Sequence, residues 1–316
     1  MIPDKEIIIE AAKRISPYIH HTPVITSERI NKIFETSLFF KCENLQKVGA
    51  FKTRGAVNAV FSLNEHEIGN GVATHSSGNH AQALARAASL RNIEAYIVMP
   101  EDSSKVKIEA VKAYGGKITF CKPTLQARED TLQRVIEQTG AIEIHPYNNY
   151  KIIAGQATAA KELFDDINNL DIVLAPVGGG GLLSGTSLSA YYFSSGTKVI
   201  AVEPSQADDA FRSFYSKKFI PSINPNTIAD GLRTSLGSLT FPIISTYVDQ
   251  IVTVNEDSII KAMRLFWEST KMIIETSAAV TLAAIQENRF EYKKKRIGII
   301  ISGGNVDLDC LPWINK

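Results

Sequence analysis

The chain has 316 residues, of which 44% are apolar and 21% charged, and its formal net charge is +1 at pH 7. This is ordinary globular composition, and the near-neutral charge gives no electrostatic reason to expect nucleic acid or a membrane surface as a partner. The three cysteines are far apart, and no apolar run approaches the roughly 18 residues of a membrane span. We therefore expect a cytoplasmic protein without a disulfide framework, a zinc site or a membrane anchor.

Hydrophobic periodicity and turn signals predict alternating helices and strands. The expected helices span residues 4–16, 27–34, 52–63, 79–90, 105–114, 125–138, 155–164, 182–193, 258–269 and 277–286. The expected strands span residues 37–43, 71–75, 95–99, 117–120, 141–145, 171–175, 198–202 and 296–301. Ser27 and the serines before residue 79 suit helix N-caps, and Gly140 suits a helix C-terminus. Such alternation builds parallel sheets flanked by helices, so we expect an α/β fold. Residues 68–148 are predicted to form a small domain inserted into a larger one, made of residues 1–67 and 149–316.

Lys52 lies where an expected strand gives way, after Gly49, to a helix of small and apolar residues. A lysine at such a junction is close to main-chain N–H groups and apolar side chains, and both lower the pKa of its amine. An amine with a lowered pKa is what a lysine needs to form a Schiff base. The alternative is that Lys52 is simply one of 34 basic residues and is solvated.

Four consecutive glycines, residues 178–181, lie between an expected strand and an expected helix. They let successive N–H groups point at one anion, and the helix N-terminus adds its positive end. The run predicts a phosphate site, but it lacks the Lys-Ser or Lys-Thr of a nucleoside-triphosphate P-loop. A dinucleotide-binding protein with Glu203 on the ribose stays open as the rival interpretation, although Leu183 replaces the third glycine of that motif.

Three other loops carry polar residues at the ends of expected strands. The N–H groups and hydroxyls of loop 74–80 suit a substrate carboxylate. Ser302 follows the last strand, where its hydroxyl can bind the ring nitrogen of a cofactor without forcing protonation of that nitrogen. Glu203, Asp208 and Asp209 place three carboxylates within seven residues, which suits Mg²⁺ or Ca²⁺. The alternatives are a turn serine and a solvated acidic turn.

The segment Ala50-Phe-Lys-Thr-Arg-Gly55 resembles the lysine site of the pyridoxal-phosphate enzymes of the tryptophan-synthase-β fold, also called fold type II. More narrowly, motifs in the right order from His21-Thr-Pro23 to Ser302-Gly-Gly-Asn-Val-Asp307 make the chain similar to the serine racemase and serine/threonine dehydratase family. The resemblance covers nearly the whole chain. It implies two domains, each with a mostly parallel sheet flanked by helices, and pyridoxal 5′-phosphate as the cofactor.

The resemblance also implies a role for individual residues. Cofactor binding falls to Lys52, Asn79, Gly178, Gly179, Gly180, Gly181, Leu182 and Ser302, with Asn79 on the ring hydroxyl. Lys52 and Ser77 act as catalytic groups on opposite faces, and the substrate contacts Ser76, Ser77, His80, Arg128 and Ser235. A divalent cation, Mg²⁺, Ca²⁺ or Mn²⁺, is held by Glu203, the Ala207 carbonyl and Asp209. ATP is expected as a modulator across a homodimer interface, at Lys47, Gln82, Tyr114, Lys271 and Asn305.

The implied reactions are racemisation of serine and elimination of water from L-serine or L-threonine, which yields a keto acid and ammonia. A dedicated threonine dehydratase and a 3-hydroxyaspartate dehydratase remain open, the latter with Arg128 or Arg233 holding the extra carboxylate. Two positions depart from the family pattern. Thr276 replaces a common proline after Glu275, and Tyr147 stands where some animal members have an asparagine on the cofactor. Feedback control by isoleucine is not expected.

Overall fold

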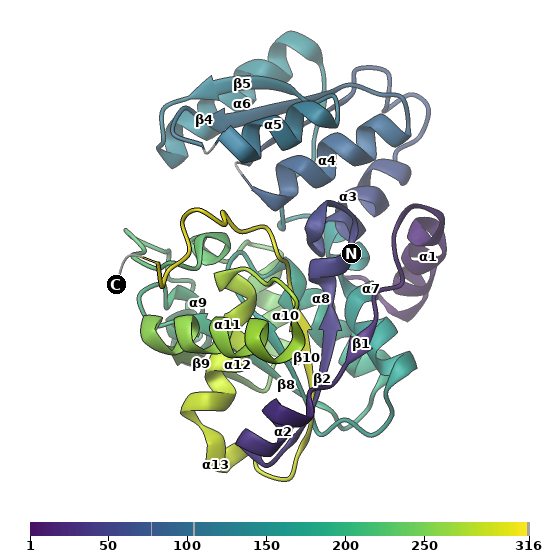
Figure 1. Ribbon diagram of the computed structural model, residues 1–316. Coiled ribbons are helices and arrows are strands. Elements are labelled where there is room, and N and C mark those ends of the chain that lie inside the picture. Colours follow the sequence, from purple (N-terminus) through teal and green to yellow (C-terminus); the bar gives the residue numbers. More distant parts are fainter. Residues whose placement is uncertain (77, 104, 315–316) are drawn as a thin grey trace.

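The computed structural model describes residues 1–76, 78–103 and 105–314. The chain forms two sheets, and helix α3 (Lys52–Phe61) lies between them (Figure 1). The large sheet uses residues 24–42 and 172–301, and the small sheet uses residues 72–143. This arrangement agrees with a small domain inserted into a larger one, whose boundary residues remain a prediction. Within the described ranges, no helix combines the length and apolarity needed to cross a membrane.

Six strands form the large sheet in the order β1-β2-β10-β7-β8-β9. They span Val24–Ile25 (β1), Ser37–Cys42 (β2), Arg296–Ile301 (β10), Ile172–Pro176 (β7), Lys198–Pro204 (β8) and Gln250–Val254 (β9). β1 is antiparallel to β2, and all other neighbours are parallel. Parallel strands are buried on both faces, which explains the unbroken apolar runs of β7 and β10. The carboxyl ends of the five parallel strands, β2, β10, β7, β8 and β9, point toward the small domain (Figure 1).

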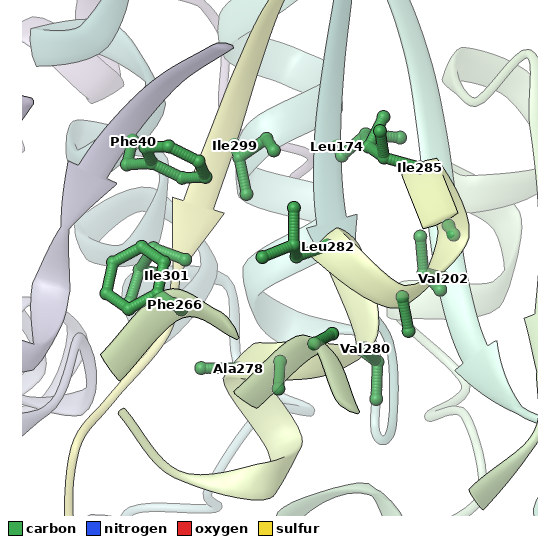
Figure 2. Close-up of a cluster of buried hydrophobic side chains, with 14 of the residues drawn as sticks. Phe40, Leu174, Val202, Phe266, Ala278, Val280, Leu282, Ile285, Ile299 and Ile301 are labelled. Atoms are coloured by element: carbon green, nitrogen blue, oxygen red, sulfur yellow. The ribbon is translucent and has the colours of Figure 1, made fainter. Parts of the chain in front are cut away.

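Helices cover both faces of the large sheet. Helices α11 (Glu256–Thr270) and α12 (Thr276–Glu287) pack on one face, and α7 (Tyr150–Asp166) and α8 (Gly181–Phe193) pack on the other. Figure 2 shows Phe40, Leu174 and Ile299 of the sheet facing Phe266 of α11 and Leu282 of α12. Full burial of such a side chain contributes about 1.5–3 kcal/mol, so this core fixes the strand ends that carry the site.

The small sheet has four parallel strands in the order β5-β4-β3-β6. They span Lys117–Cys121 (β5), Ala95–Pro100 (β4), Val72–His75 (β3) and Ile142–Glu143 (β6), and the helices are α4 (Asn79–Leu90), α5 (Lys105–Ala113) and α6 (Leu125–Thr139). Val57 and Val60 of α3 share one buried cluster with Leu84 of α4. The helix that begins with Lys52 therefore packs against the small domain.

Most predicted elements are confirmed to within a few residues, including the Ser27 cap and the left-handed Gly140. The remaining helices are α1 (Lys5–Ile15), α2 (Glu28–Phe34), α9 (Asp209–Ser216), α10 (Thr240–Tyr247) and α13 (Arg289–Tyr292). The sequence did not predict α9, α10, α13 or the edge strand β9.

The prediction of serine N-caps before α4 was wrong for the described part of that loop. The cap residue of α4 is Gly78, which has no side chain to bond, and Ser76 Oγ instead accepts from the Gly78 amide at 3.3 Å.

Helix α7 begins at Tyr150, five residues before the predicted start at Gly155. The reason is that Gly155 lies inside the helix, where it contacts α3, and does not mark the start of the helix. A Cβ on Gly155 would lie 2.6 Å from the carbonyl oxygen of Arg54 in α3. Glycine at this position lets α7 approach the helix that begins with Lys52, so a residue that usually disfavours helix serves packing here.

Candidate active site

Lys52 is the first residue of α3, and its Nζ donates a hydrogen bond to the carbonyl oxygen of Pro146 at 3.0 Å. Burial lowers the pKa of the amine to about 8, and the opposing influence of the Glu275 carboxylate is smaller. The lowered pKa predicted from the sequence is confirmed, with desolvation as its main cause. The neutral amine, which is the nucleophilic and basic form, is therefore a far larger fraction near neutral pH than in an ordinary lysine.

The lysine segment is bound to the end of the last strand. The Phe51 amide donates to the carbonyl oxygen of Ser302 at 3.0 Å, and Ala50 and Gly303 form a β-bridge. Ser302 is only 3% exposed. These contacts bring the predicted cofactor lysine and the predicted ring-nitrogen partner together, although 250 positions separate them in the sequence.

Asn79 joins the small domain to the large one through a buried polar network. Its Nδ2 donates to Glu275 Oε1 at 3.1 Å, and its Oδ1 accepts from Asn305 Nδ2 at 2.8 Å. Burial raises the pKa of Glu275 to about 7, and the nearby charge of Asp230 acts in the same direction. Reasoning from individual residues did not select Glu275 for the site. One signal in the sequence could have identified it: Glu275 is the only ionisable residue in the otherwise apolar or small-residue segment 272–280.

The glycine run has the geometry of an anion cradle. It follows β7, and α8 begins at Gly181 with Gly180 as a cap residue that has a φ of 87° and no side chain to bond the first amides. A Cβ on Gly178 would lie 2.9 Å from Leu232, and one on Gly179 would lie 2.3 Å from the ring of Tyr147. The close backbone packing and the uncapped helix amides fit a bound phosphate group.

Three histidines lie near Lys52 and are held neutral. Burial, followed in effect by the charge of Lys52, lowers the pKa of His80 to about 3. Burial lowers the pKa of His145 to about 4, and burial also lowers the pKa of His75. His80 Nε2 is 3.0 Å from the Ile144 carbonyl oxygen, so the imidazole joins α4 to the segment that follows β6. Neutral imidazoles next to the amine add no positive charge that would repel its protonated form.

Arg128 projects from α6, and its charge is one of the causes that lower the pKa of His75. It forms no ion pair with any residue that the structure describes, and its Nε is buried without a hydrogen-bond partner there. Arg233, the other arginine considered for an extra carboxylate, donates from Nε and Nη2 to the Thr227 carbonyl oxygen of its own segment. Arg128 is therefore the better anion receptor of the two.

The remaining predicted substrate contacts have mixed outcomes. Ser235 Oγ accepts from the Ser222 amide at 2.8 Å, which orders the segment next to the glycine run. Ser76 lies at the end of β3, where its amide pairs with Val98 of β4. Ser77, the predicted second catalytic group, lies outside the described residues. Its role stays a prediction.

The acidic turn after β8 contains two buried carboxylates. Glu203 accepts from the amides of Ala210 at 3.1 Å and Phe211 at 2.9 Å, in the first turn of α9. Both carboxylate oxygens of Asp209 are buried and make no well-formed hydrogen bond with a described residue, although Ser222 and the Leu236 main chain lie close enough to offset part of the effect of burial on its pKa. Burial raises the pKa of both acids, to about 6 for Asp209. Two neighbouring buried carboxyl groups, of which Asp209 lacks a well-formed hydrogen bond, fit a cation next to the Ala207 carbonyl. Among the described residues, no group of three or more His, Cys, Asp or Glu side chains is arranged to hold a metal ion, and the predicted set has only two carboxylates.

The predicted nucleotide residues lie on separate elements of this one chain. Asn305 also donates to the Val48 carbonyl oxygen, Gln82 is buried in α4, and Lys271 Nζ bonds the Glu268 carbonyl at the end of α11. Tyr114 borders a shallow cleft next to α4. With Lys47, which is half-buried before α3, they stay a prediction.

The chain is similar to known proteins over nearly its whole length. The model of the pyridoxal-phosphate dependent enzyme family matches residues 15–303. The serine racemase of Dictyostelium discoideum is 53% identical over 312 residues, which cover 97% of this chain and 96% of that protein. The β-hydroxyaspartate dehydratase of Paracoccus denitrificans is 47% identical over 312 residues, with 99% of both chains covered. The crystal structure of the Dictyostelium serine racemase superimposes with a TM-score of 0.92 at 52% identity, and the match covers 96% of this chain and 99% of that one.

The chain therefore belongs to the pyridoxal-phosphate dependent enzyme family, with the fold of its serine racemase members. The predicted family, fold class and cofactor are confirmed. The rival interpretation as a dinucleotide-binding protein is wrong, and the structure gives a reason. Glu203 is fully buried and its carboxylate accepts from the amides of α9, so a ribose cannot reach it.

Proposed function

We propose that this enzyme racemises serine and eliminates water from L-serine and L-threonine. The observation that carries the proposal is Lys52, a part-buried amine with a lowered pKa that bonds the carbonyl oxygen of Pro146, next to the tyrosine that packs on the glycine run. Similarity to serine racemases along the whole chain supports the same activity. The coarser statement, that the protein is a pyridoxal-phosphate enzyme, does not depend on this proposal.

The residues of the chain divide the work as follows. Pyridoxal phosphate, when bound, supplies the electron sink that stabilises negative charge at the Cα of the substrate. The amides of residues 178–182 would hold its phosphate, the Asn79 amide would bind its ring hydroxyl, and Ser302 Oγ would bond its ring nitrogen. Neutral Lys52 removes the α-proton from one face. Ser77 returns a proton to the opposite face, which inverts the centre, whereas loss of the β-hydroxyl leads to elimination.

The proposal also includes a metal site, an oligomeric state, a location in the cell and a regulator. A divalent cation at Glu203, Ala207 and Asp209 would neutralise two buried carboxylates. A homodimer and modulation by ATP are proposed from the family resemblance, and a location in the cytoplasm from the composition of the chain. The cation is proposed from the resemblance and from the buried oxygens of Asp209, which lack well-formed hydrogen bonds.

A second candidate substrate is a 3-hydroxyaspartate. The unpaired Arg128 favours it, because a second carboxylate on the substrate would complete an ion pair near the site. The 47% identity to a β-hydroxyaspartate dehydratase supports the same candidate. Arg128→Gln should raise KM for hydroxyaspartate about 10–100-fold, whereas the matched variant Arg233→Gln should leave it nearly unchanged.

A product assay tests the proposal. The purified enzyme is incubated separately with L-serine, L-threonine and 3-hydroxyaspartate, and enantiomers, keto acids and ammonia are quantified. We expect D-serine and pyruvate from L-serine, and no products from Lys52→Ala. A keto acid from hydroxyaspartate without D-serine from L-serine would contradict racemisation and favour the second candidate.

A further inference from the structure

Tyr147 lies in the segment that returns from β6 to α7, and its neighbours contact different parts of the site. The Pro146 carbonyl oxygen accepts from Lys52 Nζ at 3.0 Å. Asn148 Oδ1 accepts from the Leu239 amide at 2.8 Å. A short segment thus connects the cofactor lysine with the residues that precede α10.

The ring of Tyr147 packs against the main chain of the glycine run. A Cβ on Gly179 would lie 2.3 Å from Cδ1 of the ring, and one on Gly181 would lie 2.9 Å from Cβ of Tyr147. On the other side, a Cβ on Gly178 would meet the Leu232 main chain at 2.9 Å. The glycine run is therefore enclosed between the tyrosine ring and the backbone near Leu232.

The ring itself is held in place. It makes an edge-to-face contact with His145, with centroids 4.6 Å apart and an interplanar angle of 89°. His145 Nδ1 accepts from the amides of Tyr147 and Asn148, so the imidazole is fixed by the segment that it supports. Burial raises the pKa of the tyrosine hydroxyl, and Thr234, which lies next to it, lowers that pKa slightly. A ring held at its edge by His145 is a rigid surface for the glycine run.

This packing explains why residue 179 is glycine. Of the four consecutive glycines, only Gly180 has a positive φ, which is 87°. The backbone of Gly179 is thus accessible to an L-residue, and its missing side chain leaves room for the ring of Tyr147.

We propose that Tyr147 is a positioning residue whose ring holds residues 178–181 in the conformation that binds the cofactor phosphate. Four unrestrained glycines would lose much conformational entropy on binding an anion. Because the Tyr147 ring restrains them before the cofactor binds, part of that entropic cost is removed. The proposal rests on family membership and the phosphate assignment. It does not depend on whether serine is the substrate.

The test measures cofactor binding and not turnover. Cofactor-free protein is titrated with pyridoxal phosphate and, separately, with pyridoxal, which lacks the phosphate but can still react with Lys52. Tyr147→Ala should raise the dissociation constant of pyridoxal phosphate about 10–100-fold, and Tyr147→Phe should change it less than about threefold. Both variants should bind pyridoxal within about twofold of the unmodified protein, because the lysine is untouched.

Gly179→Ala tests the same contact with Tyr147 in place, and it should weaken pyridoxal phosphate about tenfold or more because the methyl displaces the loop from the ring. In the double variant, removal of the ring makes room for the methyl, so the two losses should not add. Circular dichroism of each cofactor-free variant checks folding. Unchanged affinity in Gly179→Ala, equal losses for pyridoxal and pyridoxal phosphate, or equal losses in the Phe and Ala variants would each overturn the proposal.

Discussion

Replacement of Asp209 by asparagine should stabilise the cation-free protein at neutral pH. Both oxygens of this side chain are buried and make no well-formed hydrogen bond with a described residue; Ser222 and the Leu236 main chain only partly offset the effect of burial on its pKa, and Glu203 lies nearby. An ionised carboxylate in that place is unfavourable unless a cation compensates it. An asparagine carries no charge and has a similar size, so it removes the penalty and the cation site together.

The magnitude follows from the pKa of Asp209, which burial raises from 3.8 to about 6. At about 1.4 kcal/mol for each pKa unit, ionisation of this group in the folded protein costs about 3 kcal/mol. Because the folded pKa lies above the unfolded one, the contribution to stability is full below about pH 4 and is lost as the pH rises through about 6. The unpaired amide of the asparagine offsets part of the gain, so we expect a net gain of about 1–2 kcal/mol at pH 7.5.

Thermal unfolding with and without chelator measures this effect. In EDTA at pH 7.5, the melting temperature of Asp209→Asn should exceed that of the unmodified protein by about 2–6 °C. Added Mg²⁺ or Ca²⁺ should raise the melting temperature of the unmodified protein but not that of the variant. At pH 5 the difference in EDTA should shrink, because Asp209 is then mostly protonated.

Asp208→Asn serves as the matched control, because Asp208 is adjacent, half-exposed and paired with Arg212 at 2.8 Å. This variant should keep the response to Mg²⁺. The reasoning is refuted if neither chelator nor cation changes the melting temperature of the unmodified protein, or if Asp209→Asn lowers it in EDTA.

Three further predictions concern the site and its regulation. Ser77→Ala should reduce D-serine formation from L-serine about 10²–10⁴-fold and pyruvate formation less, and a parallel loss of both products would limit Ser77 to substrate positioning. The rate at which the cofactor-free enzyme takes up pyridoxal phosphate should rise through about pH 8, where Lys52 loses its proton, and a rate that stays flat from about pH 6.5 to 9 would contradict the lowered pKa. ATP should change turnover, with Lys271→Ala weakening the effect, and indifference to ATP would remove the nucleotide prediction.

The sequence predicted the elements whose signals are local. Asn79–Leu90 and Arg296–Ile301 were predicted with the correct bounds, because their periodicity and flanking turn residues agree. Helix α9 was missed because its N-terminus is satisfied by Glu203 from the preceding strand and not by a capping residue of its own. The start of α7 was predicted incorrectly because Gly155 was interpreted as the beginning of the helix. Glycine is required there for close contact between α7 and α3, and the local sequence gives no sign of that contact.

The same distinction holds for the site. Lys52 and the glycine run could be recognised in the sequence because short contiguous motifs carry them. The contacts of Glu275 with Asn79 and of Tyr147 with Gly179 join residues far apart in the chain, so only the folded structure reveals them. The choice between Arg128 and Arg233 likewise required the hydrogen bonds of Arg233 to its own segment.

The most direct test of the account is to identify the lysine that carries the cofactor. The purified enzyme is treated with borohydride, which makes the link between pyridoxal phosphate and its lysine permanent, and the labelled peptide is mapped by mass spectrometry. The account predicts a single label on Lys52, and loss of that label in Lys52→Ala. A label on any other lysine, or an unlabelled Lys52 in active enzyme, would contradict it.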